Sequence, residues 1–383
     1  MTAVDPLRTG RRSLFAAVAG GAAVHLAARS AASKGGFAGA PAASPALSDR
    51  TAAVTLVATG LVNPRGMAFR PDGTLLVAIG GKAGPNAGVV EVTDGCPRVI
   101  VDGLPTARVA FRAIAGVSDL AVLDGRTFLL LAGGNAEGGT PPNGIYEFDD
   151  DGAVTLLADL STFIRDNPVA EVPADYDADG QPYALAVEPR GDGFLVTEGN
   201  SNQLLRVSVS DGSIERIADL SSGHPIPTGL AVDDEGAVHV AYFTAAPYEE
   251  GTARVVRILP DGMVSDVWRG LSLVIDLAFG PDGTLWALEM ATGHGDDPGA
   301  IRSGTGRVVR RGADGDSIEV ATGLELPTRM RFASDGALYV SGPAFGADDG
   351  EGWVIRHEPV VAESRPIATP AITSLTRSGE CPT

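Results

Sequence analysis

The sequence predicts an all-β protein, a six-bladed β-propeller with four antiparallel strands in each blade. First, a short apolar run, a tight turn rich in Asp and Gly, and a second alternating apolar run occur together six times. Second, the copies lie about 45 to 65 residues apart, a spacing typical of propeller blades. Third, period-two alternation, abundant Val, Ile and Leu, and Asp-Gly turns favour antiparallel hairpins.

The copies are clearest in residues 274–291, VIDLAFGPDGTLWALEMA. Two more strand-like runs follow, GRVVRRGA from Gly306 and DSIEVATGL from Asp316, so each full unit supplies four strands. A ring of such units can use about 300 residues as one domain. One position of each innermost strand sets the alignment: Ala68, Ala121, Ala186, Ala231, Ala278 and Arg331.

The sixth copy supplies only three strands, the last of which begins at Gly352. Its missing strand is expected at the other end of the chain, because VTLVATGL from Val54 reads like the blade-closing SIEVATGL from Ser317. We therefore expect the N-terminal strand to complete the last blade and close the ring, which leaves no open sheet edge there. This assigns residues 52–359 to the propeller and 360–383 to a C-terminal tail.

Residues 1–45 are interpreted as a signal peptide and linker. Arg11 and Arg12, followed by Ser-Leu-Phe and an Ala-rich apolar run, resemble a twin-arginine export signal. A general secretory signal is the alternative, because Gly10 is not the usual residue before the arginine pair. The apolar run is too short and too rich in Gly and Ala for a membrane span. We expect an extracytoplasmic or secreted protein that does not insert in a membrane after signal removal.

The chain is strongly acidic, with a formal net charge of −19. Such a surface repels nucleic acid and anionic membranes, which disfavours both as partners. We expect a soluble monomer whose partner is a small molecule or a protein.

The chain has two cysteines, Cys96 and Cys381. Cys96 follows Asp94-Gly95 in a turn of the first blade, and the tail could bring Cys381 to the same face of the neighbouring last blade. In an oxidising compartment we expect a disulfide between them, and two free thiols are the alternative.

Strand order assigns the connections to two faces of the ring. One face carries short Asp-Gly or Glu-Gly hairpins, and the opposite face, here called the long-loop face, carries long irregular connections. Variable loops are where binding usually occurs, so the long-loop face is the candidate functional face. Its connections are residues 80–87, 133–143, 161–181, 245–252, 292–305 and 343–350.

Charged residues interrupt the small residues expected where six strands converge on the central channel. These charged residues have two interpretations. Either an Arg–Asp ion pair and water molecules fill the channel, or the charged residues line a polar pocket that holds a cation or an anionic ligand. One layer contains Gly66, Asp119, Ala184, Gly229, Asp276 and Arg329. The predicted ligand-binding residues at the channel mouth are Asp119, Asp276, Arg329, Arg65, Tyr183 and His224.

A second candidate site lies before the third blade, where Asp175, Asp177 and Asp179 alternate and Gly180 follows. This resembles the start of a calcium-binding loop, so calcium is the one cofactor considered. The twelfth position is Ala186 rather than the bidentate Glu, and a solvated acidic loop is the alternative. No paired-histidine zinc spacing, nucleophile elbow or phosphate loop is present, so catalytic residues stay unknown.

Four segments stand out: NPRGMAFRPDG from Asn63, QPYALAV from Gln181, PTGLAV from Pro227 and IDLAFGPDGTLWALEMA from Ile275. Together they resemble the ScyD/ScyE family of exported bacterial propeller proteins. The resemblance implies an NHL-like six-bladed propeller over about residues 52–358, and it carries no settled reaction. We expect an exported, soluble propeller of this type that acts as a binding or scaffold module, with its molecular activity undefined.

A calcium-dependent, gluconolactonase-like hydrolase is the alternative function, with Asp119 and Asp276 near the channel. That group also has six blades, and its metal-binding Pro-Asp-Gly-Leu motif corresponds here to Pro227-Thr228-Gly229-Leu230. The sequence alone does not decide whether the protein is an enzyme, because fold does not give function.

Overall fold

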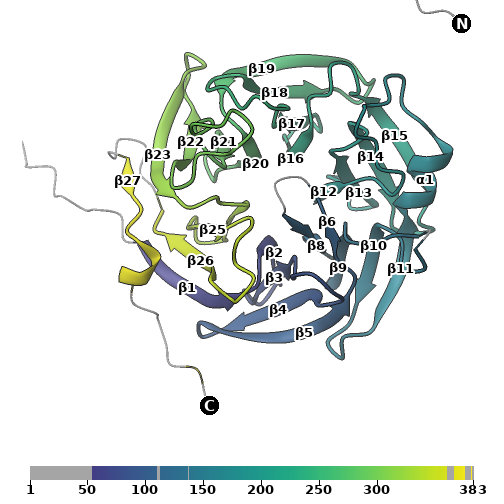
Figure 1. The fold of residues 1–383 in the computed structure, drawn as a ribbon, viewed down its shortest axis with the longest axis horizontal. Coiled ribbons are helices and arrows are strands. Elements are labelled where there is room, and N and C mark those ends of the chain that lie inside the picture. Colours follow the sequence, from purple (N-terminus) through teal and green to yellow (C-terminus); the bar gives the residue numbers. More distant parts are fainter. Residues whose placement is uncertain (1–53, 110–112, 137, 360–365, 376–380, 382–383) are drawn as a thin grey trace, which may run out of the picture. The chain divides into compact units, whose positions relative to one another are not determined.

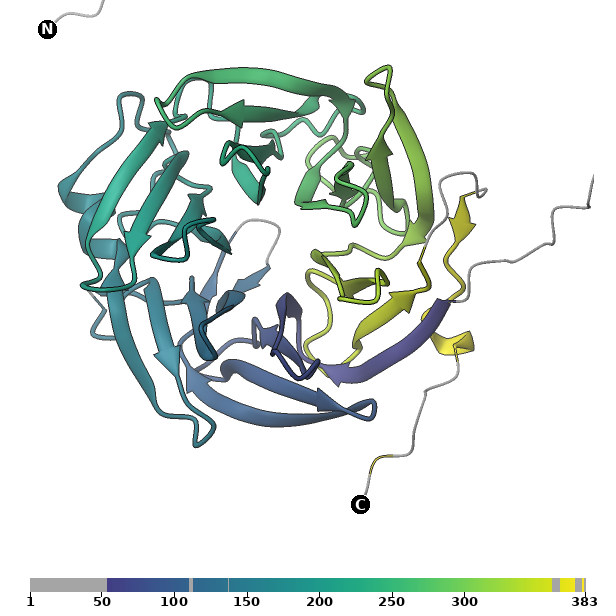
Figure 2. The same cartoon turned by 180° about the vertical axis from the view of Figure 1, so that it is seen from behind.

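A computed structural model describes residues 54–109, 113–136, 138–359, 366–375 and 381. They belong to one compact unit, Arg50–Thr383, while the predicted export signal lies outside the described residues. The unit is nearly all β, with six four-stranded antiparallel blades arranged in a ring (Figure 1, Figure 2), which confirms the predicted fold class. No helix among the described residues is long and apolar enough to cross a membrane.

Each blade runs from its innermost to its outermost strand. Blade 1 consists of β2 (Pro64–Phe69), β3 (Leu75–Ile79), β4 (Ala87–Thr93) and β5 (Cys96–Leu104), and blade 2 of β8 (Val117–Leu123), β9 (Arg126–Leu131), β10 (Gly144–Phe148) and β11 (Val154–Asp159). Blade 3 consists of β12 (Pro182–Val187), β13 (Gly193–Glu198), β14 (Gln203–Ser208) and β15 (Ile214–Asp219), and blade 4 of β16 (Pro227–Val232), β17 (Val238–Tyr242), β18 (Ala253–Ile258) and β19 (Val264–Leu271). Blade 5 consists of β20 (Val274–Phe279), β21 (Leu285–Glu289), β22 (Gly306–Arg311) and β23 (Ser317–Leu324), and blade 6 of β24 (Arg329–Phe332), β25 (Leu338–Gly342), β26 (Gly352–His357) and β1 (Val54–Leu61).

The ring closes through β1, as the sequence predicts. β1 pairs antiparallel with β26, from Val54 opposite His357 to Leu61 opposite Gly352. Figure 1 shows β1, the earliest described strand, as the outer strand beside the late strand β26. The two ends of the propeller sequence therefore share one sheet.

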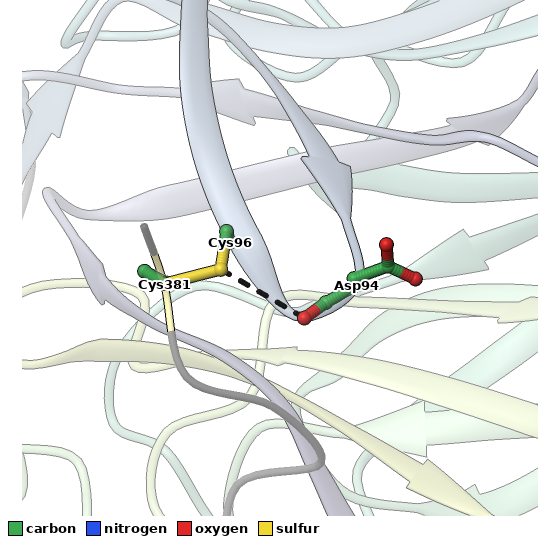
Figure 3. Close-up of a disulfide and its surroundings, with 3 residues drawn as sticks. All are labelled: Asp94, Cys96 and Cys381. Atoms are coloured by element: carbon green, nitrogen blue, oxygen red, sulfur yellow. Dashed lines mark hydrogen bonds between the residues drawn. A yellow bond between two sulfur atoms is a disulfide. The ribbon is translucent and has the colours of Figure 1, made fainter. Parts of the chain in front are cut away.

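A disulfide between Cys96 and Cys381 links the tail to blade 1, with the two Cα atoms 5.3 Å apart. Cys96 Sγ lies 3.8 Å from the Asp94 carbonyl oxygen, at the turn between β4 and β5 (Figure 3). The tail also contributes β27 (Ile367–Ala368), which pairs parallel with β23 and makes the fifth sheet five-stranded. Its other described element is the 3₁₀ helix η2 (Ile372–Ser374).

Some connections between the blades contain small elements of their own. The helix α1 (Leu160–Asp166) leads from blade 2 towards blade 3, and its N-cap Asp159 accepts a hydrogen bond from the Thr162 backbone N–H at 2.8 Å. This cap satisfies one of the free N–H groups of the first turn. A two-stranded ribbon, β6 (Ala107–Arg108) with β7 (Ile114–Ala115), lies between blades 1 and 2 in the chain.

The core lies between neighbouring blades. Six clusters of buried apolar residues occur among the described residues. Five are formed by two adjacent blades, and the sixth, between blades 5 and 6, also includes Phe243 and Tyr248, which follow β17 of blade 4. Between blades 2 and 3, for example, Phe128 and Phe194 are fully buried with ring centroids 4.8 Å apart. Burying each such ring stabilises the fold by about 2 kcal/mol. The ring is thus held by blade-to-blade packing, which fixes where the inner strands meet.

Candidate functional site

Two aspartates face the central channel from opposite blades. Asp119 on β8 and Asp276 on β20 have no exposed surface. Glycines on the preceding blades make room for them: a Cβ on Gly66 would overlap Asp119, and a Cβ on Gly229 would overlap Asp276. The same glycine–aspartate arrangement therefore occurs twice around the ring.

Each aspartate connects its own blade to the next one. The Leu185 N–H of blade 3 donates to Asp119 Oδ2 at 2.8 Å, and the Met330 N–H of blade 6 donates to Asp276 Oδ2 at 2.8 Å. Hydrogen bonds from a backbone N–H to a carboxylate are stronger than bonds between neutral groups. These two contacts hold neighbouring inner strands together.

Two arginines of β24 neutralise the aspartates. Arg329 lies 3.2 Å from Asp119 Oδ2 and 3.0 Å from Asp276 Oδ1, and Arg331 lies 3.3 Å and 3.1 Å from the Oδ2 atoms of the same residues. We call these four residues the channel plug. Its formal charge is zero, and this geometry corresponds to the ion-pair interpretation of the channel.

The plug is electrostatically self-contained. Burial raises the pKa of Asp119, while Arg329 and Arg331 act in the opposite direction. Burial lowers the pKa of Arg329, but Asp119 and Asp276 outweigh this effect and the pKa is raised overall. Arg329 is therefore charged at every physiological pH, and both carboxylates are engaged by guanidinium groups.

Arg65 and Tyr183 lie next to the plug. The Arg329 guanidinium is 4.9 Å from the Tyr183 ring centroid, and its Nη2 donates to the Tyr183 carbonyl oxygen at 3.0 Å. Burial raises the pKa of Tyr183 to about 12, although Arg329 and Arg65 lower it. Burial lowers the pKa of Arg65, and Tyr183 opposes this shift while Arg329 adds to it. Arg65, Tyr183 and Arg329 are therefore electrostatically coupled.

The polar contacts of His224 lie with a neighbouring loop rather than with the channel plug. Its Nε2 is 3.4 Å from Asp175 Oδ1, and its Nδ1 is 2.7 Å from Asn202 Nδ2. Of the predicted channel-mouth residues, the structure therefore brings together Asp119, Asp276, Arg329, Arg65 and Tyr183.

The Asp-rich loop uses its carboxylates for separate contacts. Asp179 accepts from the Ala136 N–H at 3.1 Å and lies 3.5 Å from Arg165, while Asp177 accepts from the Asp179 N–H at 3.0 Å. No group of three or more His, Cys, Asp or Glu side chains placed to hold a metal ion occurs in the described part of the chain. The donor set of Asp175, Asp177 and Asp179 does not converge, so calcium binding there stays a prediction that this geometry does not support.

Sequence reasoning did not assign a role to several buried or partly buried charged residues. Arg331 was visible as the one arginine in a layer of alanines, but its contact with both aspartates depends on the folded ring. Glu198 and Glu289 end the second strands of blades 3 and 5 and are fully buried. Glu198 accepts from the Gln181 and Asn200 N–H groups at 2.7 and 2.8 Å, which fixes the end of the Asp-rich loop. Glu198 and Glu289 occupy matching positions in two copies of the repeat, and this recurrence is the sequence signal that could have identified them.

Two cavities in the described structure lie outside the channel. One of about 280 Å³ lies between β1 and blade 1 and is lined by residues such as Leu61, Val90 and Val99. The other, of about 670 Å³, lies between blades 4 and 5 near His239 and Arg311. Neither is lined by a predicted site residue.

Comparison with known proteins supports the fold and does not assign a family or a function. No model of a protein family matches the chain, and no curated protein matches it in sequence. Solved structures do resemble it, and they place the chain in the class of six-bladed β-propellers.

Three of these structures illustrate the likeness. A calcium-binding protein, regucalcin, from Agrobacterium tumefaciens is 15% identical, with 80% of this chain and 93% of that chain covered and a TM-score of 0.54. A gluconolactonase from Xanthomonas campestris is 16% identical, with 80% and 90% covered and a TM-score of 0.53. The PQQ-bound aldose sugar dehydrogenase from Streptomyces coelicolor is 16% identical, with 80% and 98% covered and a TM-score of 0.54. The different activities of these proteins on one fold show that function has to be argued from the site.

Proposed function

We propose that this protein is an exported propeller of ScyD/ScyE type that acts as a ligand- or protein-binding module. Its ligand contacts the long-loop face over the channel mouth. One observation carries the proposal: the channel plug satisfies its own charges, while Arg65 beside it has no carboxylate partner among the described residues. Arg65 therefore leaves guanidinium N–H donors available to a ligand at the channel mouth.

The same plug argues against the gluconolactonase-like alternative. Asp119 and Asp276 face two guanidinium groups within 3.3 Å, so a divalent cation would have to displace Arg329 and Arg331. Thr228 stands where that group of enzymes carries a metal-binding aspartate, and its hydroxyl donates to the Val274 carbonyl oxygen at 2.7 Å. Metal-assisted catalysis needs carboxylates that converge on an open position, which these residues do not provide.

Export and the family assignment rest on the sequence. The arginine pair at Arg11 and Arg12 supports export, and the ordered motifs from Asn63 to Ala291 support the ScyD/ScyE assignment. The disulfide between Cys96 and Cys381 suits an oxidising compartment.

The test is a thermal-shift screen of the purified protein against small metabolites, with calcium and with a chelator, followed by hydrogen exchange on each hit. We expect ligand-dependent protection in the long-loop connections and no calcium requirement. Hydrolysis of lactones that depends on calcium would overturn the proposal in favour of the hydrolase. Protection confined to the short-hairpin face would also contradict it.

A further inference from the structure

We infer that the channel mouth recognises an oxyanion, a carboxylate or phosphate group on a small ligand, through Arg65 and the Tyr183 hydroxyl. This inference rests on the proposed binding function and names the ligand class of the same site.

The first argument is the charge on Arg65. Arg329 and Arg331 each lie against two carboxylates, whereas the one hydrogen bond of the half-buried Arg65 side chain within the described structure runs from Nη2 to the Ile114 carbonyl oxygen at 2.7 Å. A partly buried cation without a counterion costs free energy, and nearby Arg329 adds repulsion. Because the plug is neutral, Arg65 adds one positive charge beside it that an anion would neutralise.

The second argument is an excess of hydrogen-bond donors. The Tyr183 hydroxyl oxygen is 3.5 Å from the Thr328 carbonyl oxygen, which is too long for a good hydrogen bond between oxygens. Arg329 Nε is buried and has no partner within the described part of the chain. Unpaired hydrogen-bond donors favour a ligand group that accepts hydrogen bonds and donates none. Ionised carboxylates and phosphates are such groups.

The third argument is that Arg65 is held in place before any ligand arrives. A Cβ added to Gly80 would lie 3.0 Å from Arg65 Nε and 3.3 Å from its Cγ, so the side chain lies close over that glycine. The Ile114 carbonyl fixes the guanidinium end, and the Ser341 hydroxyl donates to the Arg65 carbonyl oxygen at 2.8 Å. An ordered donor loses less conformational entropy on binding, which favours affinity.

The acidic charge of the whole protein does not oppose this inference at short range. Exposed charges farther away than about 8 Å are largely screened at physiological ionic strength. A ligand in contact with the mouth therefore responds mainly to Arg65 and to the neutral plug.

The experiment is isothermal titration of the purified protein with inorganic phosphate and with succinate, at constant ionic strength in chloride. Neutral succinamide serves as the uncharged analogue. We expect saturable binding of at least one oxyanion, and the two titrations tell a phosphate-binding site from a carboxylate-binding one. Arg65→Met should weaken that binding at least tenfold, Arg65→Lys less, and Tyr183→Phe by a smaller factor.

Arg190→Met is the matched control, because Arg190 is exposed in the β12–β13 hairpin of the opposite face and the substitution removes the same charge. It should leave oxyanion binding unchanged. Circular dichroism of each variant checks folding, and Arg65→Lys keeps the test valid if Arg65→Met does not fold.

Two results would overturn the inference: no saturable binding of either oxyanion, or equal binding by the wild-type protein and Arg65→Met. If neither oxyanion binds while a neutral metabolite protects the long-loop connections from hydrogen exchange, the proposed binding function stands and the inferred ligand class is wrong. If no ligand of any charge protects that face, the proposed function itself falls.

Discussion

The channel plug predicts a large loss of stability from one small substitution, Asp276→Asn. The change keeps the size of the side chain but removes the carboxylate that lies 3.0 Å from Arg329 and 3.1 Å from Arg331. Both arginines would then share Asp119 alone, and the buried cluster would carry one uncompensated positive charge. Breaking a buried ion pair from one side typically costs about 3–5 kcal/mol, against about 0–1 kcal/mol for an exposed pair.

Denaturant unfolding followed by tryptophan fluorescence measures this loss. Trp268, Trp286 and Trp353 are all buried, so unfolding exposes every tryptophan of the chain to water. At roughly 1.5 °C per kcal/mol for a propeller of this size, the midpoint of thermal unfolding should fall by about 4–8 °C.

Glu147→Gln is the matched control for this measurement. It makes the same chemical change in the Arg126–Glu147 pair, whose side chains are 46% and 38% exposed. We expect a loss below about 1 kcal/mol there. If Asp276→Asn costs no more free energy of unfolding than this control, the plug does not stabilise the ring as a buried ion-pair network.

Three further predictions concern other buried groups. Burial lowers the pKa of His357 to about 4, so as the pH falls the His357 imidazole is protonated in the unfolded chain before it is protonated in the folded one. The free energy of unfolding should therefore drop by about 2 kcal/mol between pH 7.5 and 5. The difference in this drop between the wild-type protein and His357→Leu measures the contribution of His357. Gly229→Ala would push a methyl group into the Asp276 backbone and should cost about 1–3 kcal/mol in denaturant unfolding, and an unchanged midpoint would contradict the close approach. Replacing Cys96 and Cys381 by alanine should cost about 2–4 kcal/mol, and equal midpoints for the reduced and oxidised wild-type protein would refute a stabilising role for the disulfide.

Much of the fold could be predicted because its information is local and repeated. A strand–turn–strand pattern that occurs six times reveals the blades, and the similarity of the segments at Val54 and Ser317 reveals how the ring closes. The short helix α1 and the parallel pairing of β27 with β23 were not predicted. Neither feature belongs to the repeated pattern. The pairing of β27 also depends on where the C-terminal tail packs against the folded propeller.

The site could be predicted in part for a similar reason. Aligned inner strands show Asp119, Asp276 and Arg329 as exceptions in layers of small residues, and the structure brings all three together. The polar partner of His224 is Asp175, which comes from an irregular connection outside the repeated pattern, so the sequence could not predict this contact. Side-chain direction in irregular loops depends on tertiary contacts, which spacing along the chain does not encode.

The distribution of charge in the plug links its electrostatics to the closure of the ring. The two aspartates come from blades 2 and 5, but both counterions, Arg329 and Arg331, come from the inner strand of blade 6. Until that strand packs into the ring, Asp119 and Asp276 lack their guanidinium partners. The same blade is completed by β1 from the other end of the propeller sequence. Neutralisation of the buried aspartates therefore requires the blade that joins both ends of the chain, so the free energy of the plug favours the closed ring over any partly assembled one.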